Sequence, residues 1–294
     1  MPETTYKRRF GDRKEGRLLR SLAPFYKFMP YIMKTRNDAH DYFADSVECT
    51  EIDRGLRTKR SEGCKGMGML HLFIAAYVRA IAHCPGLNRF VSGQKVFARN
   101  DIIIVMTVKR AMTMDAPETS IKVHFQPTDT IYDVYRKLNE KIDEIKANDG
   151  DNNTEQVAAS FAKLPGLVFR FAIWLLYVLD YFDLVPQALL DASPFHGSMI
   201  ITDLGSLGIP PIYHHIYNFG NLPVFIAFGA KRRAVELDKT GTPVERKYVD
   251  YKVVMDERTI DGMHYATAFK YIKYYLRNPE ALEAPPKEVK EDIF

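Results

Sequence analysis

The pattern of apolar and polar positions predicts both strands and helices along the chain. Strands are expected where apolar residues alternate or β-branched residues run together, at residues 42–52, around 90 and 96, and at 101–110, 198–202, 224–229 and 247–255. Helices are expected where apolar residues recur every three to four positions, at residues 69–83, 128–146 and 261–276. Ser92-Gly93 predicts a hairpin turn, and Asn278-Pro279 ends the last helix. Strands and helices are interleaved without a steady repeat, so the pattern predicts an α/β fold, a two-layer sandwich with a mixed β-sheet.

One segment, residues 164–190, is more apolar than its surroundings. Its longest charge-free run covers residues 171–179, which as a helix would rise about 14 Å, roughly half the thickness of a bilayer core. We therefore predict no transmembrane span. The run is apolar on all sides, which favours burial in the fold or in an oligomer, with contact to lipid or to an acyl chain as the alternatives.

Composition narrows the class of protein. With 46% hydrophobic and 27% charged residues, the chain of 294 residues is an ordinary globular sequence, and a net charge of +4 is too small to indicate nucleic-acid binding. Basic residues cluster near the start, at positions 7, 8, 9, 13, 14, 17 and 20. We interpret residues 1–34 as a basic, solvated extension, with peripheral membrane contact or attraction to a phosphorylated ligand such as CoA as alternatives. No signal peptide is recognisable in the sequence. The three cysteines have no paired spacing, which indicates a reducing compartment, so we predict a cytoplasmic location.

A strand, a sharp turn and a helix meet near residue 260, and polar side chains gather there. The segment reads Asp256-Glu257-Arg258-Thr259-Ile260-Asp261-Gly262. Asp261 stands where it can cap the following helix. Taken alone, the segment is interpreted as a solvated strand end followed by a helix cap. The alternative is a reactive site, because a corner between a strand and a helix can hold a reactive side chain rigidly.

Residues 197–208 (GSMIITDLGSLG) change this interpretation. They resemble the strand and loop of the 2-oxoacid dehydrogenase acyltransferase (E2) catalytic domains, which precede an active-site His-x-x-x-Asp-Gly motif. Residues 224–229 and 263–282 resemble the following strand and the ending of the same domains, and residues 70–82 and 88–99 resemble their first half and that of chloramphenicol acetyltransferase. The resemblance covers residues 35–282, followed by a tail at 283–294, and implies a chloramphenicol acetyltransferase-like sandwich.

The resemblance also implies a homotrimer, open to assembly into larger cages, with active sites between subunits and acyl-CoA as substrate without a covalently bound cofactor. By position, Glu257 takes the place of the histidine base, Asp261 that of the structural aspartate, and Thr202 that of the hydroxyl that stabilises the oxyanion. Arg36 is the expected ion-pair partner of Asp261. No lipoyl-carrying segment is recognisable, so we expect a free-standing thiol or hydroxyl acceptor.

Glutamate at position 257 leaves three alternatives open. A glutamate has a pKa near 4.3 and a histidine near 6.5, so Glu257 serves as base only if its surroundings raise that pKa. Alternatively, the base is a nearby histidine, His264 or His215. The third alternative is an inactive trimeric or cage-forming homologue that scaffolds partners or binds CoA or another ligand. No third ligand stands near His214 and His215 at a convincing spacing, so we predict no metal site.

Overall fold

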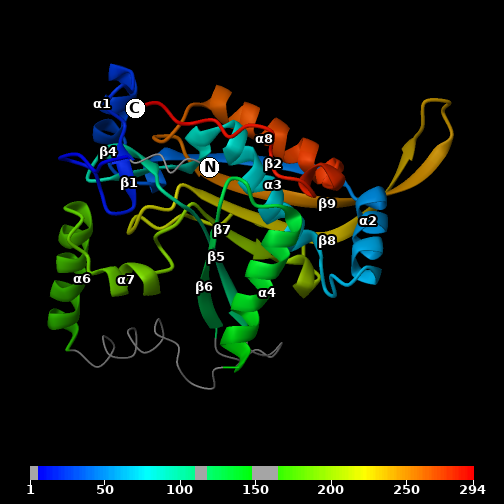
Figure 1. The fold of residues 1–294 in the computed structure, drawn as a ribbon, viewed down its shortest axis with the longest axis horizontal. Coiled ribbons are helices and arrows are strands. Elements are labelled where there is room, and N and C mark those ends of the chain that lie inside the picture. The colour runs from blue at the N-terminus through cyan, green and yellow to red at the C-terminus, as the bar shows by residue number, and fades with distance from the viewer. Residues whose placement is uncertain (1–5, 110–117, 148–164) are drawn as a thin grey trace.

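The main sheet is mixed, as predicted. The computed structural model describes residues 6–109, 118–147 and 165–294. Its six-stranded sheet has the order β2 (His40–Glu48), β9 (Pro243–Asp256), β8 (Val224–Leu237), β7 (Met199–Asp203), β5 (Ile102–Lys109) and β6 (Glu118–Phe125). Strand β7 is parallel to both β5 and β8, and the remaining pairs are antiparallel. The α/β sandwich expected from the sequence is therefore confirmed (Figure 1).

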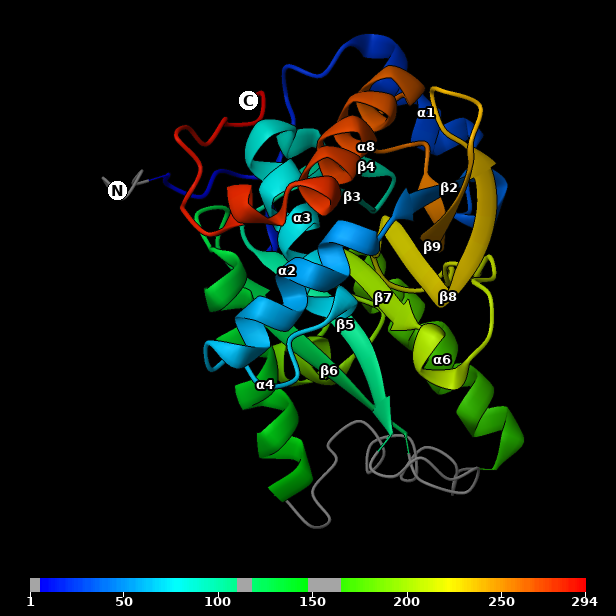
Figure 2. The same ribbon diagram turned by 90° about the vertical axis from the view of Figure 1, so that its right-hand side faces the viewer.

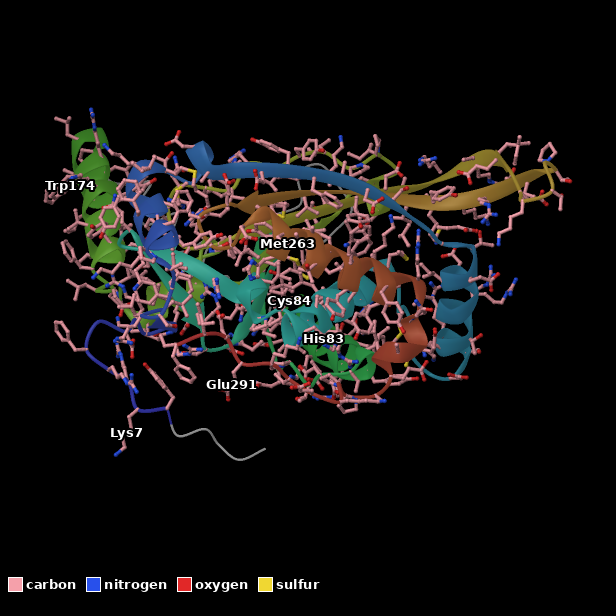
Figure 3. The ribbon with its side chains drawn as sticks, turned by 90° about the horizontal axis from the view of Figure 1, so that it is seen from above. Lys7, His83, Cys84, Trp174, Met263 and Glu291 are labelled. Atoms are coloured by element: carbon pink, nitrogen blue, oxygen red, sulfur yellow. The ribbon has the colours of Figure 1, made fainter. Side chains whose placement is uncertain are left out.

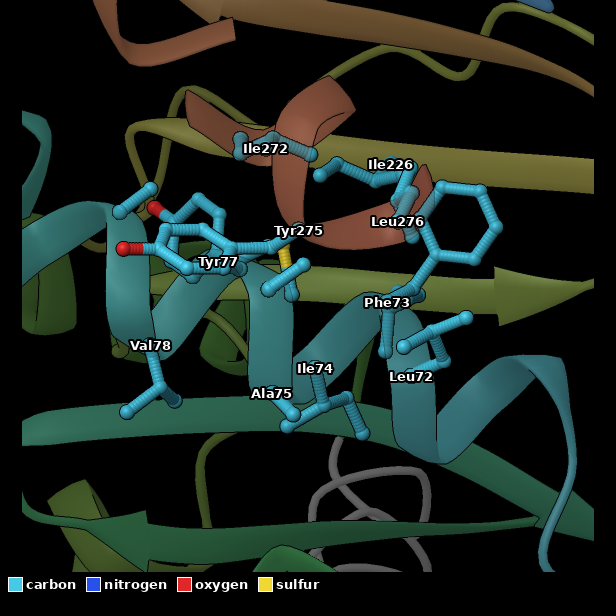
Figure 4. Packing of buried hydrophobic residues seen from close by; sticks show 14 of the residues in the cluster. Leu72, Phe73, Ile74, Ala75, Tyr77, Val78, Ile226, Ile272, Tyr275 and Leu276 are labelled. Carbon is cyan, nitrogen blue, oxygen red and sulfur yellow. The ribbon is translucent and has the colours of Figure 1, made fainter. Parts of the chain in front are cut away.

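Helices cover one face of this sheet and form the core with it. They are α2 (Thr50–Ser61), α3 (Met69–His83), α4 (Ile131–Ala147) and α8 (Gly262–Arg277), and Figure 2 shows α2, α3 and α8 together on one side of the strands. Helix α3 is the centre of the layer because thirteen of its residues are buried. Phe73 of α3 stacks on Phe228 of β8 with ring centres 4.8 Å apart. Ile272 and Leu276 of α8 lie above α3 and face it (Figure 4).

Residues 16–32 form a strand and a helix that pack on the rest of the protein, which corrects the prediction of a solvated tail for this part of the chain. Strand β1 (Gly16–Leu18) pairs with β4 (Lys95–Arg99), which in turn pairs with β3 (Arg89–Ser92). Leu19 and Leu22 are buried beside them, and helix α1 (Pro24–Ile32) follows. The β3–β4 hairpin predicted from Ser92-Gly93 is confirmed. Its two turn residues, Gly93 and Gln94, have φ values of 53° and 57°, as the tight turn of a twisted hairpin requires.

Helix α6 (Gly166–Tyr181) is not buried in the fold of a single chain, which corrects one half of the prediction for the apolar segment, while burial in an oligomer stays a prediction. None of its residues is buried, and Trp174 is 57% exposed. The helix lies with α1 at one end of the molecule (Figures 1 and 3), and the short α7 (Gln187–Ala192) links it back towards the sheet. The helical face of the sheet is already filled by α3 and α8, so α6 has no core position left. None of the described helices has both the length and the apolar content that a membrane span requires.

Strands β8 and β9 continue past the sheet as a hairpin arm, which we define as residues 231–247. A bulge between Phe228 and Lys231 separates the arm from the sheet. At its base Lys231 forms an ion pair of 2.5 Å with Asp53 of α2. The arm projects at the opposite end of the molecule from α1 and α6 (Figure 1).

Candidate active site

The corner between β9 and α8 is built on a buried carboxylate held by two arginines. Asp256, the last residue of β9, accepts hydrogen bonds from Arg258 Nε and Nη2 at 2.8 and 2.7 Å and from Arg36 Nε at 3.3 Å. The three side chains are between 1% and 4% exposed. Arg36 also donates to the carbonyl oxygen of Gly220 at 2.7 Å and to that of Tyr217. These contacts tie the corner to the loop that precedes β8.

Arg36 therefore has a different partner from the one expected. The sequence predicted an ion pair between Arg36 and Asp261, but the structure pairs Arg36 with Asp256. Asp261 lies one turn further on, where it caps α8 by accepting a hydrogen bond from the His264 backbone N–H at 2.8 Å. The same carboxylate accepts hydrogen bonds from His264 Nδ1 and from the Tyr26 hydroxyl, both at 2.8 Å. Burial opposes its charge, but these hydrogen bonds outweigh burial and lower the pKa of Asp261 to about 2.

Glu257 is exposed at the same corner. Its backbone N–H donates to the carbonyl of Ala39 at 2.9 Å, which fixes the residue beside β2. Partial desolvation, followed by the negative charges of Asp41 and Asp256, raises the pKa of the Glu257 carboxyl above its usual 4.5. A glutamate that acts as a general base requires a raised pKa, and the pKa of Glu257 is shifted in that direction.

Thr202 lies far from Glu257 within one chain. Thr202 on β7 is level with Ala227 on β8, and Ala227 is level with Lys252 on β9. Glu257 lies five residues beyond Lys252, which is about 16 Å of strand, and two strand spacings add about 10 Å sideways. A single subunit therefore cannot present both side chains to one reacting carbonyl group.

The two adjacent histidines of the loop have different neighbours. The His214 ring stacks on Phe225 at 4.4 Å, and burial lowers its pKa. The His215 side chain is exposed, with its ring 4.8 Å from that of Tyr217. His264 is also exposed and is occupied by its contact with Asp261. In residues 6–109, 118–147 and 165–294, no group of three potential ligands is placed to hold a metal ion.

One histidine at this corner was missed by the sequence prediction. His40 begins β2 and lies directly opposite Asp256 in the antiparallel pair. Its Nδ1 is 3.4 Å from the Tyr42 hydroxyl, and its buried Nε2 has no hydrogen-bond partner among the described residues. Burial lowers the pKa of His40 despite the nearby Asp256 carboxylate, and Arg36, His215 and Arg258 add to the effect. The sequence gives no sign that His40 lies beside Asp256, because that depends on the register of β2 against β9.

Solved structures share this fold. The cubic core of the pyruvate dehydrogenase multienzyme complex matches with a TM-score of 0.57 at 12% identity, over 96% of each chain. A dihydrolipoamide acetyltransferase from Azotobacter vinelandii matches with a TM-score of 0.56 at 13% identity, also over 96% of each chain. A probable dihydrolipoamide acetyltransferase from Listeria monocytogenes gives a TM-score of 0.55 at 15% identity, over 84% of this chain and 90% of that chain. The chain has the E2 acyltransferase-core fold.

At these identities the likeness extends to the fold alone. No protein-family model matches the chain, and no curated protein matches it in sequence. In the E2 acyltransferase-core fold, the structure places Glu257, Asp261 and His264 at one corner and brings His40 and His215 to the adjoining strand and loop. It does not bring Thr202 to that corner.

Proposed function

We propose that the protein is a CoA-dependent acyltransferase that transfers an acyl group from acyl-CoA to a free-standing thiol or hydroxyl acceptor. The observation that carries the proposal is the position of Glu257 within the E2 acyltransferase-core fold. Glu257 stands four residues before Asp261. The catalytic mechanism of the A. vinelandii enzyme involves a histidine and an asparagine that are also four positions apart. The spacing supports an equivalent corner in this chain.

Glu257 is the proposed general base. Its raised pKa brings the carboxylate closer to the working range of a base at neutral pH. In the reaction, Glu257 takes the proton of the acceptor, and the acceptor sulfur or oxygen attacks the thioester carbonyl carbon. The carbon–sulfur bond to CoA then breaks, and the leaving thiolate takes up the proton. His40, with its unpartnered Nε2, is the second candidate for the base.

The distance from Thr202 to Glu257 supports an active site between two copies of the chain. Thr202 of the partner subunit would supply the hydroxyl that stabilises the oxyanion opposite Glu257. We therefore propose the homotrimer that the sequence resemblance implies, with assembly of trimers into a larger cage as its extension. A cytoplasmic location stays part of the proposal.

The test measures CoA release from acetyl-CoA and octanoyl-CoA with the dithiol dihydrolipoamide as acceptor. Glu257→Gln is expected to lower kcat/KM about 100-fold or more, since loss of a general base removes at least that factor. In the wild type, kcat/KM should fall as the pH drops through the raised pKa of Glu257, and Glu257→Gln should lose that dependence. Glu245→Gln, an exposed glutamate of the hairpin arm, is the matched control and should keep wild-type rates.

Two results would change the assignment. Loss of activity in His40→Gln with wild-type rates in Glu257→Gln would move the base to His40. No heat on titration with either CoA ester, together with no CoA release, would overturn the proposal.

An inactive homologue that binds CoA or organises partners is the second candidate function. The observation that favours it is the absence of a histidine at position 257, since a carboxylate is a weaker base than an imidazole near neutral pH. Binding of CoA esters without CoA release above the rate of the enzyme-free reaction would select this function.

A further inference from the structure

A pocket of about 400 Å³ lies between α6 and the segments that lead into β7 and β8. Ile173, Leu176 and Tyr177 of α6 form one wall, and Leu189, Phe195 and Phe219 form much of the other. The volume is within the range of small-molecule sites, roughly 300–1,000 Å³. The predominance of aliphatic and aromatic side chains favours an apolar ligand.

The serine, histidine and asparagine of the lining already have partners in the protein. His196 bonds to Asp180 through Nε2 at 2.9 Å and to the Ser193 hydroxyl through Nδ1 at 2.8 Å. Asn218 accepts a hydrogen bond from the Asn37 backbone N–H at 3.0 Å. A hydrocarbon ligand therefore does not leave either imidazole nitrogen of His196 unpaired, which would be the main cost of filling such a pocket.

The C-terminal end of α6, next to the pocket wall, is fixed to the body of the protein. Asp180 belongs to the last turn of α6, and His196, its partner, is 1% exposed. Next to it, the Tyr181 hydroxyl donates to Gln94 at 3.1 Å, and Arg13 donates to the Tyr181 carbonyl at 2.6 Å. The pocket is therefore formed before any ligand arrives, which lowers the conformational cost of binding.

One arginine connects the pocket wall with the candidate active site. Arg36 binds Asp256 at the corner, and the same guanidinium donates to the carbonyl oxygens of Tyr217 and Phe219. Both of these residues line the pocket. The Tyr217 ring also contacts that of His215, so one loop forms the pocket wall and approaches the proposed chemistry.

We propose that this pocket holds the hydrocarbon chain of a medium-length acyl group while its thioester lies at the Glu257 corner. The proposal rests on the proposed acyltransferase function and specifies its donor class. Each methylene that is fully transferred from water into such a lining contributes about three- to fourfold in affinity. Octanoyl-CoA has about six methylenes more than acetyl-CoA, and burial of only about two of them makes its binding about tenfold tighter.

Calorimetric titration with acetyl-CoA, octanoyl-CoA and free octanoate tests this assignment. Leu176→Trp fills the pocket, whereas Leu175→Trp places the same side chain at the neighbouring position of α6, outside the lining. Leu176→Trp should abolish the preference for octanoyl-CoA and weaken octanoate binding at least about tenfold. Leu175→Trp should change neither, and circular dichroism melting establishes that both variants fold.

The outcomes separate the pocket from the reaction. Equal affinities for the two CoA esters, or octanoyl binding that Leu176→Trp leaves unchanged, would overturn the pocket assignment without affecting the proposed transferase. Octanoate binding lost in Leu176→Trp, with neither CoA ester bound, would support the pocket and overturn the transferase.

Discussion

Asp256 shows how one buried charge organises the candidate site. Its carboxylate pairs with two guanidinium groups, which leaves one excess positive charge. Arg36 and Arg258 also donate hydrogen bonds to backbone carbonyl oxygens of neighbouring segments, and these oxygens stabilise the excess charge. A buried ion pair adds little net stability as a whole, but removing one partner leaves an uncompensated polar group. The arrangement therefore makes the corner sensitive to single substitutions.

Arg36→Met is expected to lower the free energy of unfolding by about 3 kcal/mol, because it breaks a buried ion pair and removes the donor of three carbonyl oxygens. Urea denaturation measures the change. Arg54→Met is the control, since Arg54 pairs with Glu51 in an exposed position and should cost less than about 1 kcal/mol. Equal losses in the two variants would contradict the role assigned to Arg36.

Asp261 carries a separate prediction about pH. Its folded pKa of about 2 lies below its ordinary 3.8, so the stability it contributes is present above pH 3.8 and is lost as the pH falls towards 2. Asp261→Asn should therefore lose less stability than the wild type between pH 4 and 2, while keeping a side-chain oxygen that caps α8. Asp261→Ala also removes the cap and should cost about 1 kcal/mol at pH 7. Thermal melts between pH 4 and 2 measure the stability of the wild type and of both variants. If the wild type and Asp261→Asn lose stability equally over this range, the role assigned to the Asp261 carboxylate is wrong.

At the scale of elements, α3 and α6 have similar apolar content but opposite surroundings. The sequence indicates both helices, α3 by its recurring apolar positions and α6 by a continuous apolar run, and α3 is buried as an apolar helix normally is. The exposure of α6 was not predictable, because a window of sequence does not show that other helices already occupy the face of the sheet. Helix α2 was not predicted because it is strongly polar. Strand β6 was not predicted either, although Ile121, Val123 and Phe125 alternate with polar residues along it.

The contrast between these helices gives a stability prediction. Phe73→Ala in α3 should cost about 3–5 kcal/mol, because it opens a cavity against Phe228. Trp174→Ala in α6 should stay within about 0.5 kcal/mol in the isolated subunit, since its side chain is mostly exposed. Urea denaturation at low protein concentration compares them. A large loss in Trp174→Ala at that concentration would show that α6 packs where the structure leaves it open.

At the scale of the whole molecule, the fold was predictable and the site only in part. The 197–208 segment, the 256–262 corner and the ending were recognisable because each is a local sequence signal. His40 and the partner of Arg36 depend on the pairing of β2 with β9, which lie more than 200 positions apart. The sequence carries no local signal for that register, so the resemblance assigned Arg36 to the wrong aspartate.

The spacing of Thr202 and Glu257 predicts complementation between subunits. Thr202→Ala and Glu257→Gln should each be inactive alone, because every site in the proposed trimer then lacks one of the two groups. Co-refolded at equal amounts, they should recover about a quarter of wild-type activity, since random mixing pairs an intact Glu257 with an intact Thr202 at that frequency. Coupled CoA-release assays measure the recovery. No recovery, despite mixed trimers in native mass spectrometry, would contradict a shared site.

The hairpin arm has a consequence for how copies of the chain meet. No described strand pairs with the outer edges of the arm, and the arm carries closely spaced charges of both signs, including the Arg233–Glu245 and Arg246–Glu236 pairs at 3.1 and 3.7 Å. Charges of this kind discourage indiscriminate strand addition at an open edge. Salt screens such charges, so this protection of the open edge weakens as ionic strength rises. The hairpin arm therefore makes self-association of the protein dependent on the salt concentration.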